Sequence, residues 1–163
     1  MEHGHHHHDH QGVPVGATLN RLAFSATAHC LTGCAIGEVL GMVIGSALGL
    51  SNAATIAIAV VLAFGFGYAL TMIPLIRSGL AFGAVARLAL ASDTISITIM
   101  EIVDNAIMLL IPGAMDAPLT SPLFWGSLAF ALVIAGAAAF PVNRWLITRG
   151  RGHAVVHAHH TGH

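Results

Sequence analysis

Long segments with almost no charge are the feature that most constrains this chain. Only 8% of its 163 residues are Asp, Glu, Lys or Arg, none is lysine, and the mean hydropathy is +0.81. That composition leaves too few charged side chains to cover the surface of a soluble domain. A helix needs roughly 20 apolar residues to cross the hydrocarbon layer with its backbone hydrogen bonds satisfied. The sequence therefore predicts an integral membrane protein.

Four segments reach the length of a membrane span. We expect an all-α fold, a four-helix transmembrane bundle within residues 21–149, whose spans cover about 22–49, 53–76, 92–111 and 123–147. Between the second and third spans, residues 77–91 place two arginines among small apolar residues, which favours a short interfacial helix. Residues 1–20 and 150–163 are predicted to be disordered, His-rich tails.

The arginines orient the predicted spans. The loops at 49–54 and 112–121 hold no arginine. Every arginine falls on the other side of a four-span chain, at Arg21, Arg77, Arg87, Arg144, Arg149 and Arg151. Because cytoplasmic loops of membrane proteins carry the excess of Lys and Arg, we expect both termini to be cytoplasmic.

The first predicted span carries a ridge of small residues. Its glycines recur every four residues, at Gly33, Gly37, Gly41, Gly45 and Gly49. Such spacing lets two helix backbones approach closely in lipid, where no hydrophobic effect drives helices together. We predict that the ridge forms a homodimer or larger oligomer. The alternative is that a neighbouring helix of the same chain packs on it.

The same span carries polar and reactive side chains, in the stretch HCLTGCAIGEVLG. At about 100° of rotation per residue, Cys30, Cys34 and Glu38 lie within an arc of about 80°. His29 points about 100° away from Cys30. A buried cysteine is often only a small hydrophobe, but two of them beside an intramembrane glutamate favour a chemical role.

The third predicted span has one polar face and one apolar face. The polar side chains fall within an arc of roughly 140° and are Asp93, Met100, Glu101, Asp104, Asn105 and Met108. Acids near the middle of a bilayer cost several kcal/mol, so this face is expected to point toward the first span, at the depth of Cys34 and Glu38. The structural alternatives are a protonated Glu38 bonded to Asn105, and methionines that only fill space.

Together the two spans supply a set of candidate metal ligands. The set consists of Cys30, Cys34, Glu38, Glu101 and Asp104, joined by His29, Asn105, Met100 and Met108. Thiolate, imidazole and carboxylate ligands suit Zn²⁺, Co²⁺ or Ni²⁺, whereas thiolate with thioether suits Cu⁺. We therefore expect a transition-metal ion, and its identity among Cu, Zn, Ni and Co is left open.

Histidine is concentrated outside the predicted spans. Eleven of the twelve histidines fall in the two tails. The candidate ligands there are His5, His6, His7, His8, His157, His159 and His160. Imidazoles at this density bind borderline divalent metals without a fold. A purification tag would explain the first tract, but the second tract at the other end of the chain favours native metal-binding tails.

Three long blocks of the sequence resemble a known family. They are SATAHCLTGCAIGEVLGMVIG, SDTISITIMEIVDNAIMLLIPGAMDA and FPVNRWLITRGRGHAVVHAHH, within about residues 20–160. Through these blocks the chain is similar to the small bacterial integral membrane proteins of domain-of-unknown-function family 4396. The resemblance implies a four-helix protein with native His-rich tails and supplies no established activity. With the arginine pattern, it implies a multi-pass protein of the bacterial inner membrane.

The sequence favours binding or transport over catalysis. In the leading hypothesis, cytosolic histidines collect or sense a transition metal, and the Cys/Glu/Asp site holds it during passage or storage. The alternative is an accessory subunit whose intramembrane acids relay protons or hold a complex together. We do not expect an enzyme, because Cys30 and His29 are helical neighbours that point apart. The expected partners are the lipid bilayer, the metal ion and further copies of the chain, and no nucleic acid.

Overall fold

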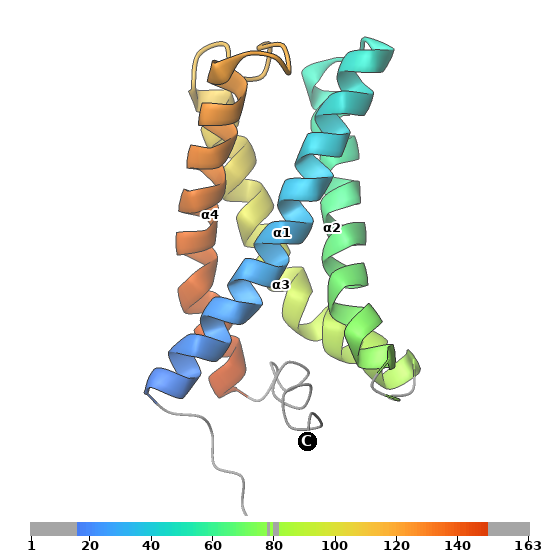
Figure 1. Cartoon of the computed structure of the whole chain (residues 1–163), viewed down its shortest axis with the longest axis vertical. Helices are drawn as coiled ribbons and strands as arrows, with labels where there is room; N and C mark the ends of the chain where they lie inside the picture. Colours follow the sequence, from blue (N-terminus) through green and yellow to red (C-terminus); the bar gives the residue numbers. More distant parts are fainter. Residues whose placement is uncertain (1–15, 78, 80–81, 150–163) are drawn as a thin grey trace, which may run out of the picture.

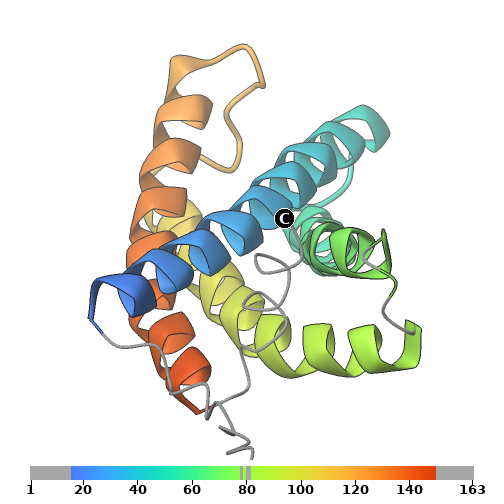
Figure 2. The same ribbon diagram turned by 60° about the horizontal axis from the view of Figure 1, so that its bottom comes forward.

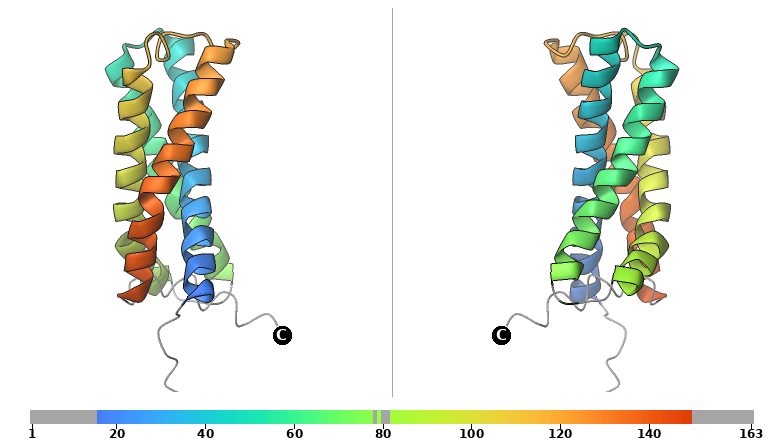
Figure 3. Two further views of the ribbon diagram at one scale, coloured as in Figure 1. Left: turned by 90° about the vertical axis from the view of Figure 1, so that its left-hand side faces the viewer. Right: turned by 90° about the vertical axis from the view of Figure 1, so that its right-hand side faces the viewer.

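The computed structural model describes residues 16–77, 79 and 82–149, and this part of the chain is all-helical. Its helices are α1 (Ala17–Leu48), α2 (Asn52–Arg77), α3 (Phe82–Leu110) and α4 (Pro122–Thr148). They run alternately up and down along one bundle, so that α1 begins and α4 ends at the same end (Figures 1 and 3). The predicted all-α class is confirmed.

The tails that the sequence predicts are only partly within the described residues. Because α1 begins at Ala17, residues 17–20 belong to this helix rather than to the predicted N-terminal tail. Residues 1–15 and 150–163, with eleven of the twelve histidines, lie outside the described part of the chain.

A tight turn connects α1 to α2. Gly49 has a φ of 61°, the left-handed conformation that commonly ends a helix, and Leu50 N donates to Gly45 O at 2.9 Å. Ser51 Oγ then accepts a hydrogen bond from Ala54 N at 3.4 Å and caps the start of α2. So short a connection makes α1 and α2 antiparallel neighbours.

The glycine ridge of α1 packs against α2 along most of its length. The residue pairs in contact are Gly33 with Gly67, Gly37 with Ala63, Gly41 with Ala59 and Gly45 with Thr55. A Cβ added at Gly33 would lie 2.7 Å from the Gly67 backbone, which is too close for any side chain. The prediction of an oligomer through this ridge is therefore wrong, because a helix of the same chain occupies it.

The third helix is longer than the sequence predicted. It runs without interruption over Phe82–Leu110, so the separate interfacial helix expected at residues 77–91 does not form. The physical reason is that residues 84–110 contain neither glycine nor proline, and nothing in them ends a helix. The first turns of α3 cross the end of the bundle obliquely before the helix runs along it (Figure 2).

A buried polar contact joins α4 to α1. Asn143 Nδ2 donates to Thr27 Oγ1 at 2.9 Å, and Thr27 Oγ1 donates to Ala23 O at 2.8 Å. Hydrogen bonds between helices in membranes contribute about 0.6–2 kcal/mol. This contact holds α4 against the half of α1 that precedes the cysteines.

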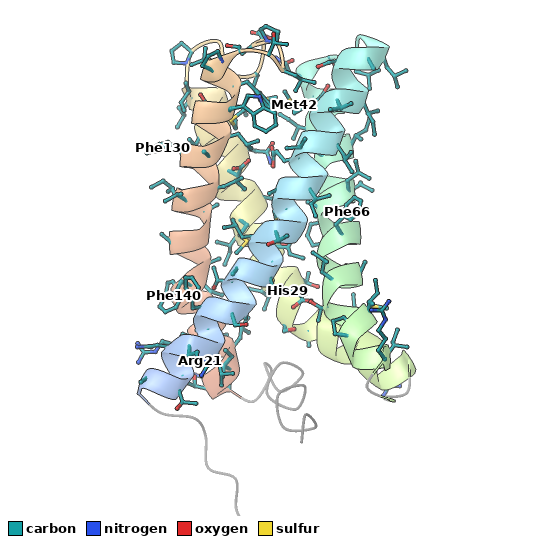
Figure 4. All side chains as sticks on the ribbon, viewed as in Figure 1. Arg21, His29, Met42, Phe66, Phe130 and Phe140 are labelled. Atoms are coloured by element: carbon teal, nitrogen blue, oxygen red, sulfur yellow. The ribbon has the colours of Figure 1, made fainter. Side chains whose placement is uncertain are left out.

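The outer surface of the bundle is apolar. Three of the described helices have the length and composition of membrane spans: Ala17–Leu48, Asn52–Pro74 and Pro122–Thr148. Large hydrophobic side chains such as Phe24, Val61 and Val133 are exposed, and Phe130 points away from the bundle (Figure 4). An apolar exterior of this kind suits contact with lipid.

We predict that Gly37→Ala destabilises the protein by about 1–3 kcal/mol, because the new methyl group would overlap the Ala63 backbone and force α1 and α2 apart. Gly65→Ala is the matched control, since a Cβ at that exposed position meets nothing within 4 Å. Thermal unfolding of both variants in detergent measures the difference. Equal stability of the two would show that the α1–α2 contact is looser than described.

Candidate functional site

One face of α1 presents a column of buried side chains that are polar or contain sulfur. Its members, Cys30, Cys34, Glu38 and Met42, are four residues apart and are all buried. Four residues is close to one helical turn, and at 1.5 Å per residue the column extends over about 18 Å. That length is more than half of the roughly 30 Å of bilayer hydrocarbon.

The buried face of α3 lies opposite this column. Met100, Asp104 and Met108 follow the same four-residue spacing, and none of them is more than 1% exposed. Glu101 and Asn105 lie beside them and are also buried. The far face of α3 is apolar and outward, with Ile102 64% exposed, so the polar side of this helix points into the bundle.

At the end of the column nearest the arginines, His29 and Cys30 lie near Asp93. Asp93 Oδ1 accepts a hydrogen bond from Ser92 Oγ at 2.9 Å. His29 and Cys30 both interact electrostatically with Asp93. Asp93 Oδ2 and His29 Nε2 are buried without a hydrogen-bond partner. The first acid of α3 thus lies near both His29 and Cys30 of α1.

In the middle of the bundle, Cys34 meets α3. Its Sγ donates to Met100 Sδ at 4.0 Å, and its thiol is adjacent to the Glu101 carboxyl group. Asn105 Nδ2 donates to the Glu101 backbone oxygen at 2.9 Å and to Glu101 Oε2 at 3.4 Å. The alternative in which Asn105 stabilises Glu38 is therefore not what this structure shows, since both of these amide hydrogen bonds go to Glu101.

Next along the column, the carboxyl groups of Glu38 and Asp104 face each other. Glu38 Oε2, both carboxyl oxygens of Asp104 and Glu101 Oε1 are buried, and no amide or hydroxyl group of the described residues donates to them. The Glu38 and Asp104 carboxyl groups therefore have each other as hydrogen-bonding neighbours. Two carboxylates repel and neither can donate a hydrogen bond. Buried groups of this kind need a proton or a cation between them.

The candidate ligands do not close around one point. Among the described residues, no three His, Cys, Asp or Glu side chains converge closely enough to hold a metal ion. They form successive levels instead: Asp93 with Cys30, then Cys34 with Glu101, then Glu38 with Asp104. Of the further candidates, Met100 contacts Cys34, Met108 lies with Met42 in a separate cluster, and the tail histidines fall outside the described residues.

Two side chains, one in these levels and one at the end of the α1 column, were not among the predicted ligands. Asp93 was placed on the polar face of the third span without being assigned a role, and Met42 was missed. The signal for Met42 was its position four residues after Glu38, which continues the spacing of Cys30 and Cys34. For Asp93 no sequence signal pointed to His29, because the two lie on different helices.

The three candidate spans, the apolar exterior and the buried acids define a multi-pass helical membrane protein. The model of one family, described as a domain of unknown function (DUF4396), matches residues 19–152. The chain belongs to this family. No curated protein and no solved structure was found to match it.

We predict that Asp104→Asn raises the free energy of unfolding by about 1–2 kcal/mol, because the new amide can donate to the Glu38 carboxyl group that now has no donor. Asp116→Asn is the control, since Asp116 is exposed and already accepts a hydrogen bond from Asn52 at 3.1 Å. Thermal unfolding in detergent provides the comparison. A loss of stability in Asp104→Asn would mean that the carboxyl group holds the helices together as it stands.

Proposed function

We propose that the protein binds a transition-metal cation inside the membrane and moves it along the α1–α3 interface. The observation that carries this proposal is the set of buried, unpartnered carboxyl oxygens on Glu38, Asp104 and Glu101, next to the Cys34 thiol. On the proposal, a cation completes the interactions that these oxygens lack. The metal is the cargo of the protein, and its cytosolic histidine tails collect or sense it.

The free energy needed to place these acids inside a membrane suggests that they are kept for a function. An ionised Asp at the centre of a spanning helix costs about 2.5–3.5 kcal/mol even on the lenient insertion scale. Asp104 is only 1% exposed, and no amide or hydroxyl group of the described residues donates to its carboxyl oxygens. A side chain kept only for packing would be replaced at lower cost by an apolar one of similar size.

The neighbouring atoms favour a transition metal over Na⁺, Ca²⁺ or Mg²⁺. Hard cations prefer sites made of oxygen alone, whereas Cys34 and Met100 place two sulfur atoms 4.0 Å apart beside the Glu101 carboxyl group. Because the donors lie in successive levels, a cation at any one level has few ligands. Passage requires binding that is strong enough to admit the ion and weak enough to release it.

The proposal includes α3 as a fourth span and an inward orientation of both termini, in the bacterial inner membrane. Supporting the span, the outward face of α3 exposes Ile102, Leu109 and Leu110, as a lipid-facing helix does. Supporting the orientation, Arg21 lies near the start of α1 and Arg149 directly follows α4, at the same end of the bundle (Figure 4). Arginine-rich ends of membrane proteins face the cytoplasm.

We expect purified protein in liposomes to conduct one or more of Zn²⁺, Co²⁺, Ni²⁺ and Cu⁺, measured with a trapped metal-sensitive dye. Asp104→Asn and Cys34→Ser remove one donor each and should lower the flux by about 10- to 100-fold. Asp116→Asn, which changes an exposed acid, should conduct as the unaltered protein does. Absence of flux for every metal, or equal flux in all variants, would refute the proposal.

A second candidate function is supported by the Glu38–Asp104 pair alone. Two facing carboxyl groups can hold one proton between them, and the acids from Asp93 to Asp104 would then relay protons or bind a larger complex. The same liposomes, loaded with a pH-sensitive dye instead, separate the two functions. Proton flux that Asp104→Asn abolishes and Cys34→Ser leaves intact would favour the relay.

A further inference from the structure

Three methionines, Met42, Met108 and Met115, lie at the end of the bundle opposite Arg21 and have no part in the function described so far. We call them the methionine cluster. Met42 of α1 and Met108 of α3 are buried in one cluster with side chains of α4. Met115, in the connection after α3, packs against the same cluster. In Figure 4, Met42 lies near the far end of α1 from Arg21.

The methionines are distributed unevenly over the molecule. The chain has six, and Met1 lies outside the described residues. Of the other five, Met100 contacts Cys34, and three belong to or pack against the apolar cluster just described. Only Met72 of α2 lies away from the α1–α3 column and outside the buried clusters.

We propose that Met42, Met108 and Met115 form a thioether site that receives Cu⁺ from the level of Cys34 and Met100. The inference deepens the proposed function and rests on it, since it names the cargo and its next binding site. It adds a second site, beyond the acids, at the end of the bundle away from the arginines.

The chemistry of the donors selects the ion. Thioether sulfur is soft and uncharged, so it binds Cu⁺ and Ag⁺ and leaves Zn²⁺, Co²⁺ and Ni²⁺ to imidazole and carboxylate ligands. Moving a monovalent ion through a medium of low dielectric constant also costs far less than moving a divalent one, because the Born energy rises with the square of the charge. Neutral sulfur ligands add no charge of their own, so the bound site keeps only the single positive charge of the ion.

The order of donors along the two helices supports a connected path. On α1 the four-residue series runs Cys30, Cys34, Glu38, Met42, and on α3 the facing series runs Met100, Asp104, Met108. Both series end on methionines of the same cluster. Sulfur-containing side chains therefore lie on both sides of the Glu38–Asp104 pair: Cys34 and Met100 on one side, Met42 and Met108 on the other.

Packing alone is the competing explanation, because methionine fills irregular gaps in cores. Replacement by leucine separates the two roles, since the side chains are close in volume and such exchanges usually cost less than about 1.5 kcal/mol. Leucine keeps the packing and removes the sulfur.

The test uses full-length protein in detergent with ¹³C-labelled methionine methyl groups, titrated with Ag⁺ as a redox-inert substitute for Cu⁺ and separately with Zn²⁺. We expect Ag⁺ to shift the methyl signals of Met42, Met108 and Met115, to leave Met72 unchanged, and Zn²⁺ to shift none of the three. The readout is specific to each residue, so metal bound by histidines does not obscure it.

Two variants complete this experiment. Met108→Leu should weaken the Ag⁺ response of Met42 and Met115 about tenfold, while Met72→Leu should leave it unchanged. Unmoved signals at the three cluster methionines, or an equal response at Met72, would overturn the inference.

Failure of this inference is distinguishable from failure of the proposed function. If the cluster does not bind Ag⁺ but Asp104→Asn still lowers metal flux as predicted, the thioether site is wrong and the proposed function stands. If the cluster binds Ag⁺ as expected but liposomes conduct no metal, the binding site stands and the transport function is wrong.

Discussion

The close contact between α1 and α2 determines what the rest of this protein can do. Four glycines of α1 lie against the backbone or small side chains of α2, and this fixes the rotation of α1 about its own axis. Cys34 follows Gly33 directly and is therefore turned by about 100° from the ridge. With the ridge against α2, the column from Cys30 to Met42 faces inward, where Cys34 reaches Met100 of α3.

Burying the three acids costs free energy of folding, which the rest of the structure must offset. Glu38, Glu101 and Asp104 all have carboxyl oxygens to which no amide or hydroxyl group of the described residues donates, although each is at most 5% exposed. Asn105 partly compensates the Glu101 carboxyl group through one hydrogen bond of 3.4 Å, whereas the group that faces Asp104 is the carboxyl group of Glu38. Buried polar groups without partners are rare in folded proteins and concentrate at functional sites.

Much of the architecture follows from patterns that the sequence shows directly. Long apolar runs predict the helices, and the 3.6-residue period of α3 correctly predicts that Ile102 faces outward while Asp104 is buried. The inward direction of the cysteines was also predicted from their spacing with Glu38. These predictions depend only on local geometry, which a helix fixes once its residues are known.

The predictions that failed concern which helix or side chain a residue contacts, and local helix geometry does not decide that. Small residues four apart suit a helix of the same chain as well as one of another copy, so the ridge was assigned to the wrong partner. Two arginines among small apolar residues suggested an interfacial helix at 77–91, but an arginine does not end a helix and α3 continues through Arg87. From the sequence, Asn105 could pair with Glu38 of the first span or with Glu101 of its own helix. In the structure it pairs with Glu101, which is one turn away.

The close approach of α1 and α2, where glycines face backbone and small side chains, also has a mechanical result. Two backbones in direct contact leave few rotamers that can rearrange, so these helices behave as one stiff body. Glu38 belongs to that body, and Asp104 belongs to the helix that faces it. Separation of the two carboxyl groups by helix motion therefore requires displacement of α3 relative to the α1–α2 hairpin, and on the proposed function a cation bound between Glu38 and Asp104 would join these two parts.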